Sequence, residues 1–452
     1  MTLLNELSAE VCQRARMSRD PRFDGRFFVA VKTTGIFCRP ICPANLPKEE
    51  NVEYFSSQAL AVSAGYRPCL RCRPESAPHS WAWKGAETTF LRALTLIEQG
   101  ELDGSLETLA SRLGISDRYL RQLFQRHLGM PPKQYAQIQQ LMFAKQLLHT
   151  SQISITEVAY ASGFQSTRRF NDAFQKLFRL TPTQVRRERA ALPSRNHLSL
   201  AFRGPFDWAH MLDFYRLRAI EGMELVDEQS YQRHFVLGEG TGWFKASMAQ
   251  SHLDIEFEME RLSDLRHLVA RLRRMFDLDA DLISIEAYLE QLAPGLVRRT
   301  GIRIPGVWNA WEAGVRAVLG QQVSVKAAIG QLNLLVSTLA ASEGSTRYFP
   351  TPEQVQMSDL SFLRMPERRK ETLKRLANYV RLHPMDPPMA WLSLSGIGPW
   401  TVDYAQLRGE SRSHCFLTGD LIVKKALAKF PQLTAESVAP WGSYATFHCW
   451  SH

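Results

Sequence analysis

Four of the seven cysteines lie in one 35-residue window as two close pairs, Cys38-x3-Cys42 and Cys69-x2-Cys72, with 26 residues between the pairs. Two thiol pairs at this spacing are typical of the four soft ligands that hold a tetrahedral Zn²⁺. In a reducing compartment, an odd cysteine total with such clustering favours a metal over disulfides. The sequence therefore predicts a small zinc domain near the N-terminus. From the thiols alone a purely structural zinc is the better interpretation, because closed four-thiolate sites are usually structural.

Length and charge limit what the rest of the chain can be. At about 100 to 200 residues per domain, 452 residues predict three or four domains. Basic side chains outnumber acidic ones by 55 to 45, and residues 1–190 carry +9 of the net +10, so the front of the chain is expected to bind a polyanion. No run approaches the ~18 apolar residues of a membrane span, and the first residues lack a signal-peptide pattern. We therefore expect a cytoplasmic protein with no membrane partner.

The residues around the cysteines resemble a known family. The motifs are Asp20-Pro21-Arg22-Phe23-Asp24-Gly25, Thr33-Thr34-Gly35-Ile36-Phe37-Cys38-Arg39-Pro40, Glu50-Asn51-Val52 and Gly65-Tyr66-Arg67-Pro68-Cys69-x-Arg71-Cys72. Over about residues 8–76 they resemble the N-terminal zinc domain of Ada-type alkylation-response proteins. In that family the cysteine of the Phe-Cys-Arg-Pro motif, here Cys38, is both a zinc ligand and the nucleophile that removes a methyl group from a DNA methylphosphotriester. The resemblance also implies phosphate contacts for Thr34, Arg67 and Arg71, although a solvated surface position is an equal alternative for each arginine.

The chemistry that the resemblance implies is physically coherent. Four thiolates on Zn²⁺ give a site of formal charge −2, which keeps a sulfur anionic and nucleophilic at neutral pH. Methylation of one thiolate changes that charge to −1. Because the change weakens the repulsion of phosphates, we expect the methylated protein to bind DNA more tightly, which would couple damage to a DNA-binding switch.

Residues 101–189 contain an internal repeat. Each copy reads as a helix, a Gly-containing turn and a second helix, which is the helix-turn-helix plan. The core positions of the second helices, Leu120 and Phe124 in one copy and Phe170 and Phe174 in the other, lie 50 residues apart. Ser116 in the first copy and Ser166 in the second are the predicted N-caps of these helices. The polar positions that remain for DNA are Arg118, Arg121, Gln122, Thr167, Arg168 and Asn171. An ordinary charged helix face is the alternative for any one of the arginines.

The second copy resembles AraC-type DNA-binding domains. The matching residues are Gly163-Phe164-x-Ser166-x3-Phe170-x3-Phe174-x-Lys176 and Thr181-Pro182. The resemblance implies a bipartite reader of the DNA major groove that regulates transcription at an operator, with RNA polymerase as a further partner.

After Asn196 the pattern changes to short strand-like runs such as residues 252–258, and from about Pro305 it returns to helix. This order predicts an α+β segment followed by a helical domain. Turn-rich stretches at residues 74–80 and 191–196 predict the domain boundaries. The run Leu394-Ser395-Gly396-Ile397-Gly398-Pro399-Trp400-Thr401 has the form of a hairpin whose backbone N–H groups can approach a phosphate.

Residues 197–452 resemble the AlkA-type 3-methyladenine DNA glycosylases of the helix-hairpin-helix superfamily. The resemblance is carried by this hairpin, by Asp420 located 22 residues after its second glycine, and by Pro305-Gly306, Ala317-Val318-Leu319-Gly320-Gln321-Gln322-Val323-Ser324-Val325 and Phe206-Asp207-Trp208. The family's essential aspartate corresponds to Asp420. Cleavage of the N-glycosidic bond passes through an oxocarbenium-like sugar, which a carboxylate facing C1′ can stabilise. From position alone, a helix N-cap before Leu421 is an equally good interpretation of this residue.

The resemblance also implies the reaction class and the substrate. Superfamily members that also cut the strand carry a lysine where this chain has Trp400, so a monofunctional enzyme that leaves an abasic site is implied. Alkylated purines carry positive charge, and an aromatic pocket can hold them by stacking and cation–π attraction, although isolated aromatic residues are usually core residues. The implied substrate contacts are Trp400, Tyr404, Trp450, Trp208 and Gln321, and the implied DNA contacts are Gly396, Gly398 and Gln322. The best-known bacterial relative inserts an apolar wedge into the duplex at the position of Gln322.

The sequence thus predicts a multidomain, mainly α protein with an α+β part. Its predicted domains are a zinc domain (1–78), a double helix-turn-helix (85–190), an α+β subdomain (196–295) and a helix-hairpin-helix glycosylase domain (296–452). The predicted function is repair of DNA alkylation damage and the transcriptional response to it, with Zn²⁺ as cofactor and alkylated and operator double-stranded DNA as partners. The alternative is a transcriptional regulator whose C-terminal half binds DNA without turnover. The chain has no Pro-Cys-His-Arg motif, so direct reversal of base methylation is not predicted.

Overall fold

The computed structural model divides the chain into two compact units, Met1–Gln146 with Val158–Val185, and Leu147–Glu157 with Arg186–His452. The structure describes residues 7–56, 58–69, 71–72, 74, 87–98, 102, 105–186, 196–340, 342–343, 346–384 and 386–451. Most of the two expected linkers, residues 75–80 and 191–195, lies outside these ranges. Among the helices in the described ranges, none combines the length and the apolar character that a membrane crossing requires.

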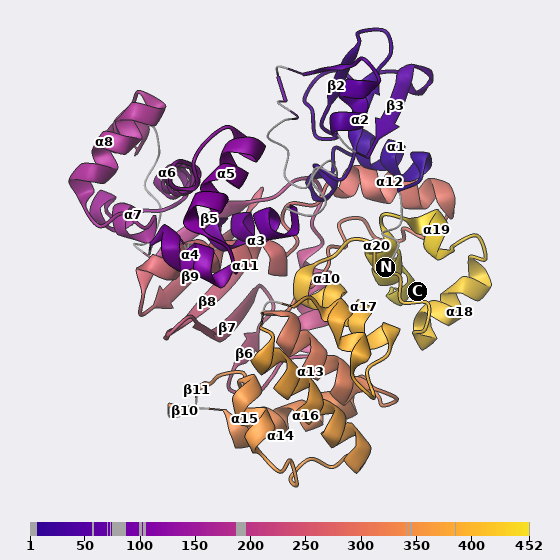
Figure 1. Cartoon of the computed structure of the whole chain (residues 1–452). Helices are drawn as coiled ribbons and strands as arrows, with labels where there is room; N and C mark the ends of the chain where they lie inside the picture. Colours follow the sequence, from indigo (N-terminus) through magenta and orange to yellow (C-terminus); the bar gives the residue numbers. More distant parts are fainter. Residues whose placement is uncertain are drawn as a thin grey trace. The chain divides into compact units, whose positions relative to one another are not determined.

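The four-cysteine segment folds around a small sheet, drawn in indigo in Figure 1. Its elements are α1 (Ala9–Met17), β1 (Phe28–Val31), β2 (Ile36–Cys38), β3 (Val52–Phe55), α2 (Gln58–Ser63) and β4 (Arg67–Pro68). The strand order is β3-β1-β2-β4, and only β2 and β4 pair in parallel. Gly35 adopts a φ of +63° in the turn between β1 and β2, a conformation that costs glycine little. Phe28, Ala30 and Phe37 form the buried core of this segment.

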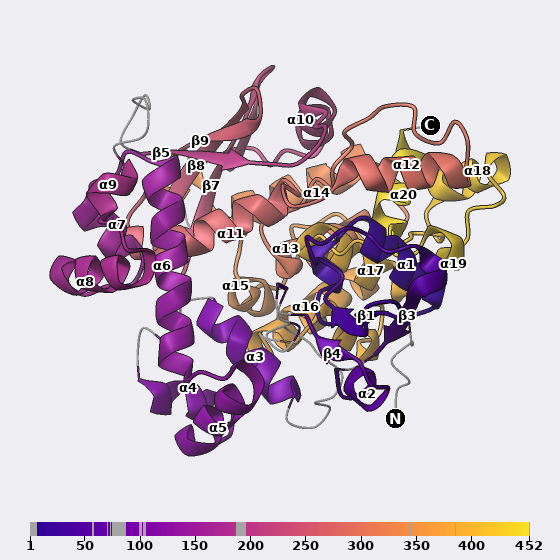
Figure 2. The same ribbon diagram turned by 90° about the horizontal axis from the view of Figure 1, so that it is seen from above.

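The repeated segment folds as two helix-turn-helix units joined by a long helix. Its helices are α3 (Glu87–Glu98), α4 (Leu106–Arg112), α5 (Asp117–Leu128), α6 (Pro132–Thr150), α7 (Ile155–Ala161), α8 (Thr167–Phe178) and α9 (Pro182–Arg186). Figure 2 shows α6 as a straight rod with α3, α4 and α5 near one end and α7, α8 and α9 near the other. The predicted N-cap of α5 is confirmed, since the hydroxyl of Ser116 accepts a bond from Tyr119 N. Ser166 is the N-cap residue of α8, but its side chain makes no capping bond. The four predicted core positions, Leu120, Phe124, Phe170 and Phe174, are all fully buried.

The second unit begins with an antiparallel sheet of strand order β5-β9-β8-β7-β6. Its elements are β5 (His197–Ala201), α10 (Trp208–Arg216), β6 (Glu224–Val226), β7 (Ser230–Leu237), β8 (Gly240–Met248), β9 (His252–Met259), α11 (Leu265–Met275) and α12 (Leu282–Leu292). The predicted strand at residues 252–258 is confirmed as β9, whose alternate residues Leu253, Ile255 and Phe257 are buried. The buried face of the sheet meets Phe276, whose ring centroid lies 6.2 Å from that of Phe244.

The remainder of the second unit is helical, as expected. Its elements are α13 (Ala310–Gly320), α14 (Val325–Leu339), β10 (Ser342–Glu343), β11 (Thr346–Arg347), α15 (Pro352–Met357), α16 (Glu367–Leu382), α17 (Pro399–Glu410), α18 (Leu421–Lys429), α19 (Ala435–Val438) and α20 (Gly442–Trp450). Helix α13 is the central element, and α17 packs closely against it. A Cβ atom at Gly409 of α17 would lie 2.5 Å from the Cα atom of Ala310, so only glycine allows this approach. The expected multidomain, mainly helical architecture with an α+β part is therefore confirmed.

A buried cluster of four charged side chains joins the sheet to α13. Arg233 of β7 pairs with Glu224 of β6 at 2.9 Å and with Glu312 of α13 at 2.5 Å. Arg316, one turn after Glu312, pairs with the same two glutamates at 3.1 and 2.8 Å. The four side chains are at most 6% exposed. Burial opposes the charge of Glu312, but Arg233 and Arg316 lower its pKa to about 2.

Removing one carboxylate from this cluster should destabilise the second unit strongly. In a Glu312→Gln variant two buried guanidinium groups would share one carboxylate, and we expect unfolding to become easier by about 3–5 kcal/mol. Urea unfolding followed by tryptophan fluorescence reports on this unit, since eight of the ten tryptophans follow residue 196. The control is Glu239→Gln, which breaks the exposed pair with Arg261 and should shift the transition little. Equal transitions for the two variants would contradict the prediction.

Candidate functional site

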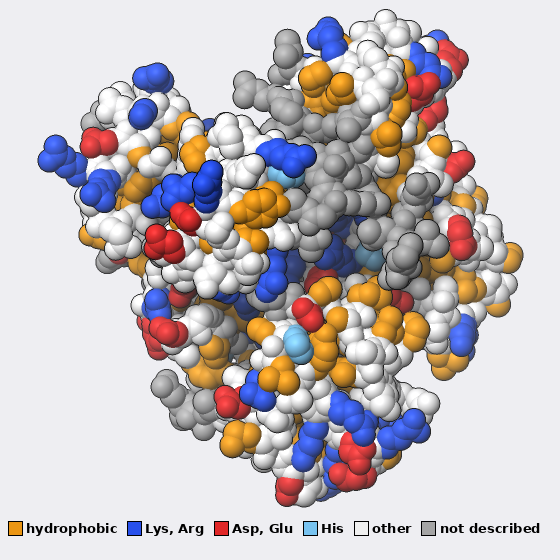
Figure 3. Space-filling view, in the orientation of Figure 1, with side chains coloured by type: hydrophobic (Ala, Val, Ile, Leu, Met, Phe, Trp, Pro, Cys, Tyr) orange, Lys and Arg blue, Asp and Glu red, His pale blue; other side chains and the backbone are white. Residues whose placement is uncertain are grey.

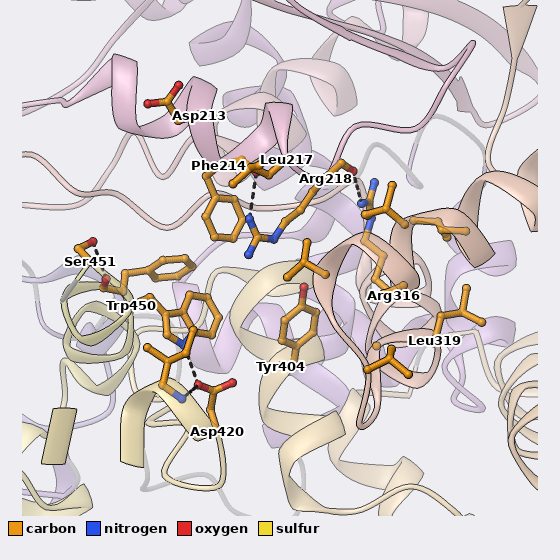
Figure 4. Close-up of a pocket in the computed structure, with 18 of the residues that line it drawn as sticks. Asp213, Phe214, Leu217, Arg218, Arg316, Leu319, Tyr404, Asp420, Trp450 and Ser451 are labelled. Carbon is orange, nitrogen blue, oxygen red and sulfur yellow. Dashed lines mark hydrogen bonds between the residues drawn. The ribbon is translucent and has the colours of Figure 1, made fainter. Parts of the chain in front are cut away.

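A pocket of about 500 Å³ lies within the second unit, where α10, α13, α14, α17, α18 and α20 converge. Figure 4 shows its interior, with aromatic rings on facing sides, the carboxylate of Asp420 at the lower edge and that of Asp213 at the top of the view. A concave site with mostly apolar walls and a few polar groups is the usual form of a site for a small organic group.

Aromatic rings form much of the pocket wall. Trp400 and Tyr404 lie one turn apart on α17, and their ring centroids are 5.4 Å apart with planes inclined by 28°. Phe214 of α10 and Trp450 of α20 are stacked at 6.2 Å and 15°. Phe447 meets the Trp450 ring edge-on at 4.9 Å. The structure therefore brings three of the predicted substrate contacts, Trp400, Tyr404 and Trp450, to the pocket that Asp420 also lines.

A guanidinium group adds positive charge to this wall. The Arg218 guanidinium carbon lies 3.7 Å from the centroid of the Phe214 ring, and Nη1 donates to Phe214 O at 3.2 Å. Burial lowers the pKa of Arg218 to about 10, which leaves the group charged at neutral pH. Arg316 also lines the pocket and donates through Nη1 to Arg218 O at 3.0 Å. The buried ion cluster is thereby connected to the pocket.

The carboxylate of Asp420 uses its two oxygens differently. Oδ1 accepts bonds from the backbone N–H groups of Ile422 and Val423 at 2.9 and 3.2 Å, and from Trp450 Nε1 at 3.1 Å. The structure gives no donor for Oδ2 among the described residues. The two interpretations of Asp420 are therefore compatible, because the residue caps α18 and also presents an uncommitted oxygen at the pocket.

The two glycines of the predicted hairpin are placed there for different structural reasons. Gly396 has a φ of +92°, and a Cβ atom there would lie 2.1 Å from Thr372 Oγ1. Gly398 is the N-cap residue of α17, so the first-turn N–H groups of that helix lie at the hairpin.

The side chain of Gln321 donates from Nε2 to Gly396 O at 3.3 Å and to Thr401 Oγ1 at 3.2 Å. Gln321 thus ties the α13–α14 turn to the hairpin, and the neighbouring Gln322 is exposed with a φ of +55°.

The structure does not bring Trp208 to the pocket. This residue is 8% exposed, and its indole Nε1 donates to Gln229 O at 2.9 Å. Its ring packs edge-on against Phe206 and Phe276 in the core of the α+β part. Burial of its large apolar surface, rather than a pocket, accounts for its position.

Phe214, Arg218 and Phe447 also line the pocket, but they were not among the residues predicted from the sequence. Phe214 and Arg218 are four residues apart at the end of an amphipathic helix whose apolar face is otherwise core. Phe447 lies in a helix that is buried almost throughout. Neither pattern distinguishes a pocket wall from ordinary packing, so the sequence carried no signal for them.

The four cysteines meet as predicted. The sulfur atoms of Cys38, Cys42, Cys69 and Cys72 all lie within 4.8 Å of one another, and none of the thiols forms a disulfide. Zinc–sulfur bonds of about 2.3 Å in a tetrahedron place sulfurs roughly 4 Å apart, so the cluster fits Zn²⁺. Cys38 ends β2, and the bond from Cys69 N to Phe37 O at 2.9 Å brings the second thiol pair beside the first.

A partly buried ion pair that was not predicted from the sequence supports the cluster. Arg39, directly after Cys38, donates from Nε to Asp24 Oδ1 at 2.7 Å and pairs with the same carboxylate through Nη2. Its backbone N–H donates to Cys72 Sγ at 3.4 Å. Both residues belong to the motifs around the cysteines, but their spacing of 15 residues did not indicate that they pair.

The predicted phosphate contacts of this segment are all exposed. Thr34 lies in the turn before β2, Arg67 lies on β4 beside Ile36 of β2, and Arg71 lies in the loop between Cys69 and Cys72. The three residues therefore sit on the small sheet and loop that carry the thiols.

The predicted DNA contacts of the two helix-turn-helix units lie on the outer faces of α5 and α8. Arg118, Arg121 and Gln122 are exposed on α5, and Arg121 pairs with Asp117 one turn earlier at 3.0 Å. On α8, Arg168 and Asn171 are exposed and Thr167 is half-buried. Figure 3 shows Lys and Arg side chains gathered on the surface of this helical segment.

Comparison with known domain families agrees with the three resemblances. The metal-binding domain of Ada matches residues 11–75, a helix-turn-helix domain matches residues 109–188, and the AlkA N-terminal domain matches residues 197–309. The zinc site predicted from the four cysteines is thus the metal site of an Ada-type domain.

Comparison with curated proteins extends the similarity over the whole chain. DNA-3-methyladenine glycosylase 2 of Escherichia coli is 34% identical over 277 residues, which cover 56% of this chain and 96% of that protein. The bifunctional transcriptional activator/DNA repair enzyme Ada of Escherichia coli is 35% identical over 170 residues, 38% of this chain and 47% of that protein. A probable bifunctional transcriptional activator/DNA repair enzyme AlkA of Mycobacterium tuberculosis is 35% identical over 478 residues, 98% of this chain and 96% of that protein. Since this last similarity runs almost from end to end of both proteins, the chain belongs to the family of bifunctional transcriptional activator and DNA repair proteins that join Ada and AlkA domains.

Proposed function

We propose that this protein is a monofunctional DNA glycosylase that hydrolyses the N-glycosidic bond of alkylated purines such as 3-methyladenine. The same chain accepts methyl groups from DNA methylphosphotriesters on Cys38 and regulates transcription. The observation that carries the glycosylase assignment is the uncommitted Oδ2 of Asp420 at the edge of an aromatic pocket. In this proposal residues 1–78 accept the methyl group, 85–190 read DNA sequence, and 196–295 with 296–452 form the glycosylase.

The pocket walls account for binding of the damaged base. A base reaches such a pocket only when its nucleotide is turned out of the duplex. Trp400, Tyr404 and Trp450 then offer ring faces on which the base stacks, and the positive charge of an alkylated purine adds cation–π attraction. The N–H groups of Gly398 and Trp400, at the start of α17, are placed to bind the phosphate backbone beside the lesion.

The carboxylate of Asp420 accounts for cleavage. As the bond between C1′ and the base nitrogen breaks, its electron pair leaves with the base and positive charge develops on the sugar. The negative Oδ2 stabilises this charge and orients a water molecule, which adds to C1′ and gives up a proton to the solvent. Trp400 stands where strand-cutting relatives carry an amine, so the products are the free base and an abasic site.

Substitution of Asp420 tests the glycosylase assignment. Asparagine also caps helices well, so Asp420→Asn should keep α18 intact while it removes the negative charge. We expect release of methylated bases from alkylated duplex DNA to slow by about 100-fold or more. The matched control is Asp281→Asn, which alters the N-cap of α12 in the same way and should release bases at the wild-type rate. Equal background release by wild type and Asp420→Asn would favour the alternative of DNA binding without turnover.

The thiol cluster accounts for methyl acceptance. Bound Zn²⁺ keeps its cysteine ligands deprotonated and therefore nucleophilic. The Cys38 sulfur attacks the methyl carbon of the phosphotriester, a carbon–sulfur bond forms, and the carbon–oxygen bond breaks with its electrons going to the departing phosphodiester. Cys38 is half-buried at the end of β2, so the residue is not enclosed in the core of the segment, which supports its role as the acceptor.

Mass spectrometry tests methyl acceptance. Incubation of the zinc-loaded protein with duplex DNA carrying a methylphosphotriester should add one methyl group, located on Cys38. Cys38→Ser should remain unmodified. The control Cys12→Ser should still be methylated, because Cys12 is buried and desolvation raises its pKa to about 12, which keeps that thiol unreactive. An unmodified Cys38 in the wild-type protein would leave only a structural role for the zinc.

The helix-turn-helix units complete the proposed function. The polar faces of α5 and α8 would enter successive major grooves of an operator. A transcription activator of this kind would also contact RNA polymerase, and because its substrates and operators are chromosomal DNA we place its action in the cytoplasm.

A further inference from the structure

The bonds that hold the Asp420 carboxylate come from two different parts of the fold. Two donors to Oδ1 are the N–H groups of Ile422 and Val423, which belong to the first turn of α18. Any aspartate at an N-cap position accepts bonds of this kind. The third donor is Nε1 of Trp450, which lies 30 residues further along the chain and belongs to α20. Capping of α18 does not require this third bond.

The third bond restricts the direction of the free oxygen. The torsion that rotates a carboxylate group about its Cβ–Cγ bond is broad and roughly twofold. Bonds from two neighbouring amides on one side of Oδ1 leave part of this rotation open. An indole N–H that approaches the same oxygen from another helix limits it, and Figure 4 shows the second oxygen turned toward the side of Tyr404.

The Trp450 ring is itself fixed by aromatic packing. Phe447 contacts it edge-on at 4.9 Å, and Phe214 stacks against it at 6.2 Å. The ring also lines the pocket. The surface on which a base would stack and the donor that holds the carboxylate are therefore parts of one side chain.

We propose that Trp450 is the positioning residue of Asp420, in addition to forming a wall of the base pocket. Its indole N–H holds Oδ1 so that Oδ2 points to the place that the sugar of the extruded nucleotide occupies. The inference rests on the proposed glycosylase function. It assigns to Trp450 an effect on the rate of bond cleavage that is separate from its effect on base binding.

Trp450→Phe separates the two roles, because phenylalanine keeps an aromatic face but has no N–H group. We would measure single-turnover release of 7-methylguanine from duplex DNA over a range of enzyme concentrations. The rate constant at saturation should fall about tenfold, the effect of losing one charge-assisted hydrogen bond, while the enzyme concentration for half-maximal rate changes by less than about twofold. The matched control is Trp243→Phe, which removes an indole bond to the carboxylate of Glu258 at 3.2 Å on the sheet and should leave both values unchanged.

A second measurement covers the case in which Trp450→Phe does not fold. In protein labelled with ¹⁵N-tryptophan, Asp420→Asn should shift the indole N–H resonance of Trp450 and leave that of Trp243 in place. An unmoved Trp450 resonance would overturn the inference.

The outcomes also distinguish this inference from the function on which it rests. In one outcome, the wild type is active, Asp420→Asn is inactive, and the rate constant of Trp450→Phe equals that of the wild type. This outcome would overturn the positioning role alone. A Trp450→Phe defect confined to the half-maximal concentration would overturn it too, because the ring would then act only as a wall. Wild-type protein with no base release above background would overturn the proposed function and the positioning role together.

Discussion

The buried cluster of two arginines and two glutamates is the interaction on which the arrangement of the second unit depends. Taking four charges out of water is costly, and the cost is offset only because each guanidinium meets both carboxylates at hydrogen-bond distance. The cluster fixes β6 and β7 to α13. Through Arg316 it also holds the backbone of Arg218 and contributes to the pocket wall. The pocket is therefore positioned by a charge balance in the core as well as by apolar packing.

Asp420 shows how a structural role and a chemical role can share one side chain. A carboxylate has two oxygens, and a helix N-terminus needs only one of them. Capping α18 places the charge at the positive end of that helix, where an anion is stabilised, and leaves the second oxygen for the pocket. Gln321 also makes two contacts with one side chain, because its amide connects the α13–α14 turn to the hairpin. These bonds align the pocket rim with the backbone groups proposed to bind phosphate.

Local patterns allowed much of this fold to be predicted. The paired cysteines, the 50-residue repeat and the alternation in β9 each depend on contacts within a short stretch or on a chemical requirement that few residues satisfy. Trp208 and Phe214 show where such reasoning stops. Both are aromatic residues of α10, yet Trp208 is enclosed by core rings while Phe214 faces the pocket. Their local sequence is equally compatible with either place.

The sequence by itself determined the zinc ligands, the two helix-turn-helix units and the hairpin glycines, because each rests on spacing along the chain. The aspartate before α18 was singled out by the resemblance to a known family, since its position alone is equally compatible with a helix cap. Only the tertiary structure decided which aromatic residues form the pocket, that Arg39 pairs with Asp24, and that Trp450 bonds to Asp420. The residues in the last two pairs are 15 and 30 positions apart in the chain. They lie on elements whose mutual packing depends on the whole core. A spacing rule cannot encode them, since the distance between two such side chains is set by the other elements that pack between and around them.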